Sequence, residues 1–228
     1  MKTALIAPIV SEDTSIRHSK AEQKRVVYEF CCDKNSELGK VAGDHNINCV
    51  RLSKEAADLF DHSQVERVIG QIRKTPGCHL HASLPCTVWS TWQHINCRKK
   101  GPDYIRRLEN RRHQSLILFD HFVEVATAVR QGGGTISFEW PRYCLGWTQP
   151  SVLKFLSSFN MSSVLIDGCA FGMDHQGQPI KKQWRIVSDH ARLLSDLSPW
   201  TCPKSHKRKE ISGSLTPKTA HCNSLMNR

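Results

Sequence analysis

From residue 25 onward, short runs rich in β-branched residues alternate with longer amphipathic stretches. Strands are predicted over residues 26–30, 48–52, 78–84, 135–139, 163–167 and 184–187, and helices over 56–73, 116–129 and 152–159. Apolar residues spaced three or four apart predict the helices, and compact apolar runs predict the strands. Because the two kinds of element alternate, the predicted fold class is α/β, a mostly parallel sheet with helices on both faces.

The length and local composition predict one large domain with an extension at each end. A chain of 228 residues is long enough for one full hydrophobic core. Residues 1–24 are polar without a sustained period, which predicts a flexible leader, and residues 25–198 carry the alternating pattern. Residues 199–228 are basic, turn-rich and contain cysteine and histidine, which predicts a tail.

The charge balance points to a polyanionic partner. The chain has 32 Lys and Arg against 21 Asp and Glu, a formal net charge of +11. Such an excess attracts nucleic acid through the summed field and counterion release. The alternative is a solvated basic surface that keeps the protein soluble. The basic run between Arg98 and Arg112 has the same two interpretations, a phosphate-binding rim or a solvated helix face.

The N-terminal sequence does not predict export or a membrane anchor. A short apolar stretch at residues 4–10 is followed by Glu12 and Asp13, which makes a poor signal peptide. No apolar run approaches the length that crosses a bilayer. We therefore expect an intracellular protein, nuclear or cytoplasmic, whose ten cysteines are reduced and available for packing, metal binding or nucleophilic attack.

Two polar residues follow predicted strands where an open parallel sheet places its ligands. Cys86 comes after the 78–84 strand and Glu139 ends the 135–139 strand. A cysteine held on such a loop can attack as the thiolate, and a protonated glutamate beside it can donate to a ring nitrogen. Taken alone, Cys86 could instead be a small, buried apolar residue with no role in catalysis. Together the two residues suit addition across a pyrimidine ring.

The order of these motifs resembles the catalytic domain of DNA cytosine-C5 methyltransferases over about residues 26–188. Residues 27–39 resemble the first strand and cofactor loop, and Ser83-Leu84-Pro85-Cys86-Thr87 resembles the proline-cysteine nucleophile loop. Phe138-Glu139-Trp140-Pro141 resembles the motif whose glutamate contacts the target cytosine. Ala170-Phe171-Gly172, with Pro179 and residues 181–185, resembles the segment that follows.

The resemblance implies a Rossmann-like fold that binds S-adenosylmethionine, and a substrate of cytosine in nucleic acid, with DNA favoured over RNA. It implies attack of Cys86 on C6 of the base, assistance by Glu139 at N3 and methyl transfer to C5. In a duplex the base would first be flipped out of the stack.

The implied cofactor contacts are Glu29, Phe30, Cys31, Gly39, Arg51 and Pro85. The implied substrate contacts are Thr87, Ser90, Trp140, Lys181 and Arg185. Of the tryptophans near the motifs, Trp140 is expected in the pocket and Trp92 in packing.

The chain departs from the family pattern in ways that support a second hypothesis. Residues 32–37 lack the family's glycines, and Arg51 stands where a carboxylate for the cofactor ribose is expected, a role that Glu55 or Asp58 could take. Only about 40 residues follow the last strand, so no full target-recognition domain is expected. The alternative is a catalytically degenerate module that binds nucleic acid.

The C-terminal segment contains four side chains of metal-ligand type. Cys202, His206, His221 and Cys222 could together form a tetrahedral zinc site. The competing interpretation is a basic tail, because adjacent residues such as His221 and Cys222 seldom both reach one metal. A zinc-dependent interaction domain is accordingly a third hypothesis.

His79 and His81 share one face of their predicted strand, because alternate residues of a strand point the same way. They could bind a ligand as a pair, but hydrogen-bonded histidines near the pocket are the favoured interpretation.

Overall fold

The computed structural model describes residues 25–210 of the chain. Its strands are Arg25–Phe30 (β1), Ile47–Leu52 (β2), His79–Ala82 (β3), Thr135–Pro141 (β4), Ser162–Asp167 (β5), Asp174–His175 (β6), Gln178–Lys181 (β7), Gln183–Ser188 (β8) and Lys209–Glu210 (β9). Its α-helices are Glu37–Val41 (α1), His62–Ile72 (α2), Trp92–Lys100 (α3), Pro102–Gln131 (α4), Pro150–Ser158 (α5) and Ala191–Leu197 (α6). Short 3₁₀ helices are Gly43–His45 (η1), Thr87–Trp89 (η2), Leu145–Thr148 (η3) and Gly168–Phe171 (η4).

Six strands form one sheet in the order β2-β1-β3-β4-β8-β5. Strands β1 to β4 pair in parallel, and β8 runs antiparallel to both of its neighbours, β4 and β5. The predicted α/β class with a mostly parallel sheet is therefore confirmed. From β1 the chain first moves outward to β2 and then returns to β3 on the other side of β1, so the strand order reverses between β1 and β3. Open α/β sheets bind ligands at the carboxyl end of such a reversal.

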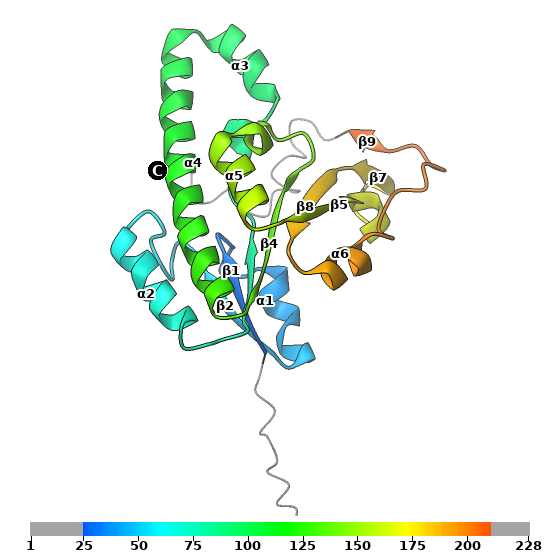
Figure 1. Ribbon diagram of the computed structural model, residues 1–228. Coiled ribbons are helices and arrows are strands. Elements are labelled where there is room, and N and C mark those ends of the chain that lie inside the picture. The colour runs from blue at the N-terminus through cyan, green and yellow to red at the C-terminus, as the bar shows by residue number, and fades with distance from the viewer. Residues whose placement is uncertain (1–24, 211–228) are drawn as a thin grey trace, which may run out of the picture.

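Helices α2, α4 and α5 lie on one side of the sheet, and α1 and α6 lie on the other (Figure 1). Helix α4 has 30 residues, about 45 Å at the rise of an α-helix. Its C-terminal half packs on the sheet, whereas its N-terminal half extends past the sheet and forms a projecting hairpin with α3 (Figure 1).

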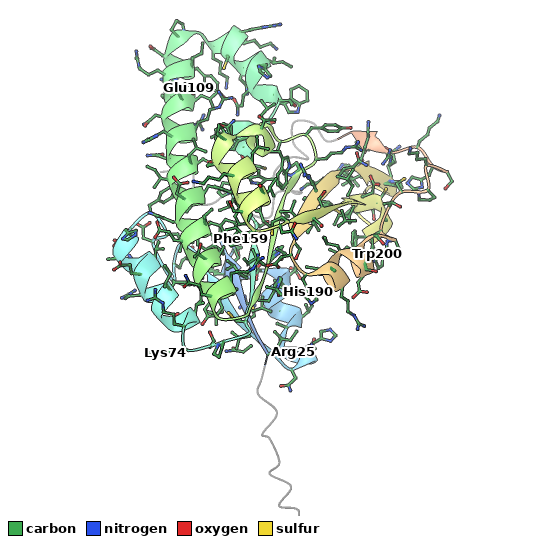
Figure 2. All side chains as sticks on the ribbon, viewed as in Figure 1. Arg25, Lys74, Glu109, Phe159, His190 and Trp200 are labelled. Carbon is green, nitrogen blue, oxygen red and sulfur yellow. The ribbon has the colours of Figure 1, made fainter. Side chains whose placement is uncertain are left out.

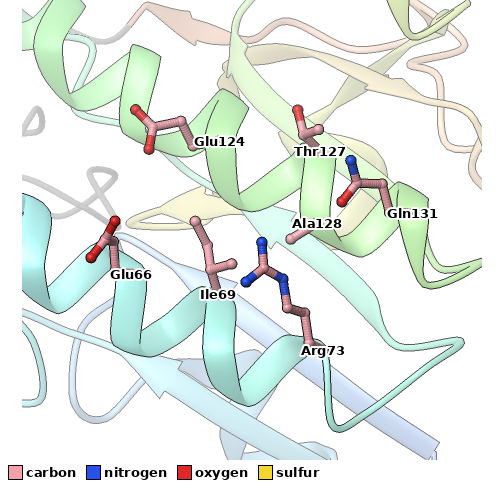
Figure 3. A pocket seen from close by; sticks show the side chains of 7 residues that line it. All are labelled: Glu66, Ile69, Arg73, Glu124, Thr127, Ala128 and Gln131. Carbon is pink, nitrogen blue, oxygen red and sulfur yellow. The ribbon is translucent and has the colours of Figure 1, made fainter.

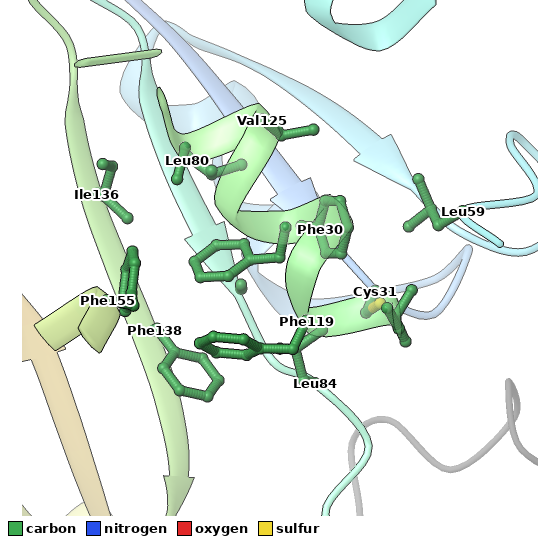
Figure 4. Close-up of a cluster of buried hydrophobic side chains, with 14 of the residues drawn as sticks. Phe30, Cys31, Leu59, Leu80, Leu84, Phe119, Val125, Ile136, Phe138 and Phe155 are labelled. Carbon is green, nitrogen blue, oxygen red and sulfur yellow. The ribbon is translucent and has the colours of Figure 1, made fainter. Parts of the chain in front are cut away.

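The main core lies between α4 and the sheet (Figure 4). Leu118, Phe122, Val125 and Val129 recur at helical spacing on α4 and are almost fully buried. They meet a group of aromatic rings, within which Phe122 lies 5.3 to 5.8 Å, between ring centroids, from Phe30, Phe119, Phe138 and Phe155. Such edge-to-face and tilted pairs are the arrangements that aromatic rings favour.

The opposite face of the central strands is polar. His79 contacts Thr135 through Nδ1 and Ser137 through Nε2, both at 2.8 Å, and His81 Nδ1 contacts Ser137 Oγ at 2.8 Å. These residues are paired in register between β3 and β4, which places their side chains side by side. Both histidines thus make hydrogen bonds within the sheet, in agreement with the favoured interpretation.

Two helix boundaries differ from the expected ones. The helix expected over 56–73 begins at His62, because Asp61 accepts a hydrogen bond from the amide of Ser63 and caps the helix there. The helix expected over 116–129 begins at Pro102, a residue well suited to a first helical position. Helix α3 was not predicted, since its apolar residues form no continuous face.

Part of the expected tail packs on the domain. The amide of Asp167 donates to the carbonyl of Trp200 at 2.9 Å, and β9 pairs with β7, which itself pairs with β6. Trp200 stacks on Phe171 with a ring-centroid distance of 4.5 Å, beside α6 (Figure 2). The expected leader, residues 1–24, and residues 211–228 of the expected tail lie outside the described residues.

Candidate active site

Four strands bring polar side chains to one end of the sheet, where the parallel strands terminate. The carboxyl ends of β1, β3 and β4 share this edge because the strands are parallel. Cys86 follows β3, Glu139 lies near the end of β4, and Lys182 immediately precedes β8, whose antiparallel direction starts it at the same edge. The structure thus brings the predicted pair, Cys86 and Glu139, together with a lysine that sequence reasoning missed.

The loop that carries Cys86 is attached to β4 from both faces of the sheet. Ser83 Oγ donates a hydrogen bond to the Glu139 carboxylate. On the opposite face, Trp140 Nε1 donates to the carbonyl of Leu84 at 2.8 Å. Because Glu139 and Trp140 are consecutive in a strand, one side chain on each face fixes the loop. The position of Cys86 relative to Glu139 is therefore set by β4 itself.

The turn after Cys86 is fixed by the helical hairpin. Arg112 Nε donates to the carbonyl of Val88 at 3.2 Å, and Trp89 Nε1 donates to Ser115 Oγ at 2.9 Å. Gln93 Nε2 donates to the carbonyl of Thr87 at 2.8 Å. These bonds join η2 to α3 and α4, so the loop that carries Cys86 and the hairpin form one connected unit.

Opposing effects act on the Cys86 thiol. Burial is the largest and raises its pKa, because a thiolate is poorly solvated there; the Glu139 carboxylate raises it further. The Lys182 ammonium is the largest effect in the other direction and lowers the pKa. The net pKa lies above the ordinary value. Lys182 is therefore the residue that favours the reactive thiolate.

Lys182 is itself strongly influenced by its surroundings. Burial lowers its pKa, whereas Glu139 and Cys86 raise it. Its Nζ lies 4.5 Å from the centroid of the Trp184 ring, a cation–π contact that helps to hold the ammonium. The sequence resemblance pointed to Lys181, which lies exposed on β7. No sequence motif identifies Lys182, because it reaches the site only when β8 pairs antiparallel with β4.

Some predicted cofactor residues are polar and lie at the strand ends, whereas others are buried in the core. Glu29 lies near the end of β1; its carboxylate accepts from Ser36 Oγ and lies 3.8 Å from Cys49 Sγ. Phe30 is fully buried in the core beneath α4, and Pro85 is also buried. Cys31 is buried too, yet it turns the backbone with a φ of 61°, the left-handed conformation that glycine normally supplies.

Arg51, at the end of β2, lies across α1. Its Nε donates to Ser36 Oγ at 3.1 Å, and a Cβ atom at residue 39 would overlap its guanidinium, so Arg51 takes this position because residue 39 is glycine. Gly39 also donates its amide to Ser36 Oγ at 3.2 Å. Glu29, Ser36, Gly39 and Arg51 thus form one polar group at the ends of β1 and β2. The guanidinium offers several N–H donors there.

The two tryptophans take the reverse of their expected places. Trp140, expected in the pocket, is 3% exposed and packs in the core, whereas Trp92, expected in packing, is 55% exposed at the start of α3. The reason is the alternation of β4, which directs Trp140 toward α4 when Glu139 faces the other way. Trp140 supports the loop that carries Cys86 from the core side, through its hydrogen bond to the Leu84 carbonyl.

The remaining predicted substrate residues lie around the same edge. Thr87 is exposed in η2, and Ser90 Oγ accepts from the amide of Trp92 at 3.3 Å, just before α3. Arg185 lies in β8, where its guanidinium stacks over the Trp147 ring at 4.8 Å from the centroid.

Of the four predicted metal ligands, the structure places two. Cys202 Sγ lies 3.6 Å from His206 Nε2, and Cys169, which the sequence analysis missed, joins them. His221 and Cys222 lie outside the described residues. Cys169 could not be found by spacing, because it is 33 residues away and approaches only when β5 and the C-terminal segment meet.

A groove of about 570 Å³ lies between α2 and α4. It is lined by Glu66, Ile69, Arg73, Glu124, Thr127, Ala128 and Gln131 (Figure 3). The lining residues of α4 lie in its last turns, just before β4 begins, so the groove is at the amino end of the strands. It is therefore remote from Cys86. Within residues 25–210, no helix has both the length and the apolar character needed to span a membrane.

Comparison of the chain with family models, with curated proteins and with solved structures found no match. The geometry of the site must therefore support any functional conclusion.

Proposed function

We propose that this protein is an S-adenosylmethionine-dependent methyltransferase that modifies cytosine in nucleic acid through a covalent adduct with Cys86. The observation that carries the proposal is the meeting of Cys86, Glu139 and Lys182 at the carboxyl edge of the sheet. A nucleophile, a hydrogen-bonding acid and a cation that favours the thiolate are the groups that addition to a pyrimidine needs.

The polar group at the ends of β1 and β2 fits the proposed cofactor. The Glu29 carboxylate can accept from the cofactor's amino group, and the Arg51 guanidinium can donate to the ribose hydroxyl oxygens, where a carboxylate would instead accept from them. The left-handed backbone at Cys31 makes the turn without a glycine. When bound, S-adenosylmethionine supplies an electrophilic methyl group.

The roles of the chain's own residues follow from the geometry. Lys182 stabilises the Cys86 thiolate, which adds to C6 of the base and forms a sulfur–carbon bond. The electron pair of the C5–C6 double bond then becomes available at C5, and Glu139, when protonated, donates to N3 and stabilises this electron density. After methylation, water takes the C5 proton, the C5–C6 double bond forms again as the C6–sulfur bond breaks, Cys86 leaves as thiolate, and N3 returns its proton to Glu139.

The projecting α3–α4 hairpin supplies the proposed nucleic-acid surface. Between Trp92 and Arg112 the chain has seven Lys or Arg residues against two acidic residues, Asp103 and Glu109. Exposed Trp92 lies at the base of this hairpin, close in sequence to η2. A basic surface with an exposed aromatic ring suits phosphates together with an unstacked base.

A methyl-transfer assay tests the proposal. The purified chain is incubated with S-adenosylmethionine and cytosine-containing DNA or RNA, and 5-methylcytosine is measured by mass spectrometry after digestion. We expect product from the wild type, none from Cys86→Ser, and unchanged product from Cys97→Ser, a half-buried cysteine of α3 that packs on the core. Product formation by a well-folded Cys86→Ser variant, or none by the wild type, would contradict the proposal.

The second candidate is a nucleic-acid-binding module without turnover. Two observations at the proposed cofactor site favour it: α1 has only five residues, and Arg51 crosses it. Calorimetric titration with S-adenosylmethionine separates the candidates. The enzyme requires binding, whereas a module that binds nucleic acid but not S-adenosylmethionine would establish the second candidate.

A further inference from the structure

We propose that Cys169, Cys202 and His206 bind a zinc ion that fastens the C-terminal segment to the edge of the sheet beside Lys182. The proposed zinc site stands on its own observations and does not rest on the proposed methyl transfer. The three side chains come from two separate segments, η4 after β5 and the turn before β9. Their ligand atoms all lie within 4.8 Å of one another.

The spacing between the ligand atoms of Cys202 and His206 matches tetrahedral zinc. Bonds of about 2.3 Å to sulfur and about 2.0–2.1 Å to nitrogen, at the tetrahedral angle, separate the two ligand atoms by about 3.5–3.6 Å. Cys202 Sγ and His206 Nε2 are 3.6 Å apart. Two thiolates with one imidazole are also the ligand types that zinc favours over magnesium or calcium.

The turn between Cys202 and His206 directs both side chains to one point. Lys204 adopts a left-handed φ of 61°, and its amide donates to Cys202 Sγ at 3.3 Å. The amide of Cys202 in turn donates to Asp167 Oδ2 at 2.9 Å. The backbone therefore holds the sulfur of Cys202 in place from both sides, as the surroundings of a metal ligand commonly do.

The charges around the cluster suit zinc. Zinc with two thiolates and one neutral imidazole has no net charge, and the neighbouring Asp167 carboxylate is paired with Arg208 at 3.0 Å. The ion therefore adds no unbalanced charge to this region, in which Cys202 is buried and Cys169 is half-buried. Three protein ligands leave one tetrahedral position, which water can fill.

The proposed zinc site is linked to the candidate active site by a backbone hydrogen bond. The amide of Gly168, next to Cys169, donates to the carbonyl of Lys182 at 2.7 Å. Ile180 of β7 pairs with Lys209 of β9, three residues beyond His206. Zinc would therefore hold together the two segments that determine where Lys182 lies.

The test is metal content, measured on the full chain purified without chelator. Elemental analysis should find zinc in equimolar amount with the wild type. Cys169→Ser and His206→Ala should each lose most of it, whereas Cys97→Ser should retain it. Replacement by cobalt should give thiolate-to-metal charge-transfer and tetrahedral ligand-field absorption in the wild type, and this absorption should be lost in Cys169→Ser.

Near-UV circular dichroism of each variant reports whether it is folded, so that loss of metal is not confused with loss of structure. A folded wild type that binds neither zinc nor cobalt would overturn the proposal. Equal zinc in Cys169→Ser and Cys97→Ser would also overturn it. So would loss of zinc in Cys222→Ser together with full retention in Cys169→Ser, because the ligands would then be a different set.

Discussion

The reactivity of Cys86 depends on a balance between burial, which raises the pKa of its thiol, and the Lys182 ammonium, which lowers it. Replacing Lys182 by methionine removes the ammonium and keeps a side chain of similar length. The effect of burial, which raises the pKa of Cys86, should then be largely unopposed. The thiolate fraction at neutral pH would then fall, since only the deprotonated thiol is a nucleophile.

In Lys182→Met we therefore expect alkylation of Cys86 by iodoacetamide to slow several-fold at pH 7 and its pH profile to move to higher pH. Mass spectrometry of the Cys86 peptide follows the modification. Lys181→Met, at the exposed neighbour on β7, serves as the control and should behave as the wild type. If the two variants gave the same profile, the role assigned to Lys182 would be wrong.

Trp140 should contribute to stability through its hydrogen bond to the Leu84 carbonyl. Trp140→Phe keeps an aromatic ring in the core but leaves that buried carbonyl unpaired, which costs about 1–3 kcal/mol. Urea unfolding followed by circular dichroism measures the loss. In Trp92→Phe, at an exposed position, the change should stay within about 0.5 kcal/mol. Equal effects in the two variants would contradict the assignment of Trp140 to the core.

Among the residues, the sequence predicted the positions of Cys86 and Glu139 at the ends of neighbouring strands, because motif order locates residues at strand ends. It could not identify Lys182 or Cys169. Both reach their sites through turns and pairing that join segments distant in the chain. It also exchanged the places of Trp92 and Trp140, because the face toward which a strand residue points depends on which helices cover that face.

Among the elements, the α3–α4 hairpin carries most of the proposed affinity for nucleic acid. Arg98, Lys99 and Arg107 are exposed on it. A triple alanine variant of these residues should bind oligonucleotides more weakly, and the slope of log affinity against log salt should fall by about 0.9 for each lost contact with a duplex phosphate. Fluorescence anisotropy across a salt series measures both.

The matched control removes the same charge from another helix. Arg67 lies in α2, and Arg73 and Lys74 follow at its end, all of them exposed. Their triple alanine variant should keep nearly the wild-type salt slope. If the two triple variants lost affinity and slope equally, binding would depend on net charge alone, and the hairpin would have no special role.

Most helices and strands were predictable because the spacing of apolar residues along a short stretch of sequence depends on that stretch alone. All six strands expected for the sheet are present, with bounds within two residues of the expected ones. The first half of α4 and all of α3 were missed, because these segments project from the sheet and carry charged residues around most of their surface. The antiparallel direction of β8 was also not predicted, since strand direction is a property of the sheet rather than of the strand.

At the scale of the whole molecule, the buried His79 should make stability depend on pH. Burial is the main cause that lowers its pKa from 6.5 to about 4, with smaller effects from His81 and His190. Between these values the unfolded chain binds a proton that the folded chain does not. Stability therefore rises with pH through this window and is lost as the pH falls from 6.5 toward 4, by at most about 3 kcal/mol from this residue.

Urea unfolding at pH 7 and pH 5 measures this dependence. His79→Asn, which keeps polar atoms near Thr135 and Ser137, should lose less stability than the wild type between the two pH values. His62→Asn, at an exposed histidine beside Glu124, should follow the wild type. A wild-type pH dependence in His79→Asn would show that other groups cause it.

The topology also explains why the candidate sites share one edge. Parallel β1, β3, β4 and β5 all end there, and antiparallel β8 begins there. Cys86, Glu139, Lys182 and the proposed metal ligand Cys169 are thereby collected from segments that span about half of the described chain.

Covalent trapping on 5-fluorocytosine tests the central claim, that Cys86 is the nucleophile, most directly. The fluorine at C5 cannot leave as a proton does, so methylation would hold the base on the protein. The account predicts a methylated oligonucleotide adduct that mass spectrometry maps to Cys86, that needs S-adenosylmethionine, and that is absent from Cys86→Ser. An adduct that persists in Cys86→Ser, or none from a wild-type protein that binds both cofactor and oligonucleotide, would contradict the account.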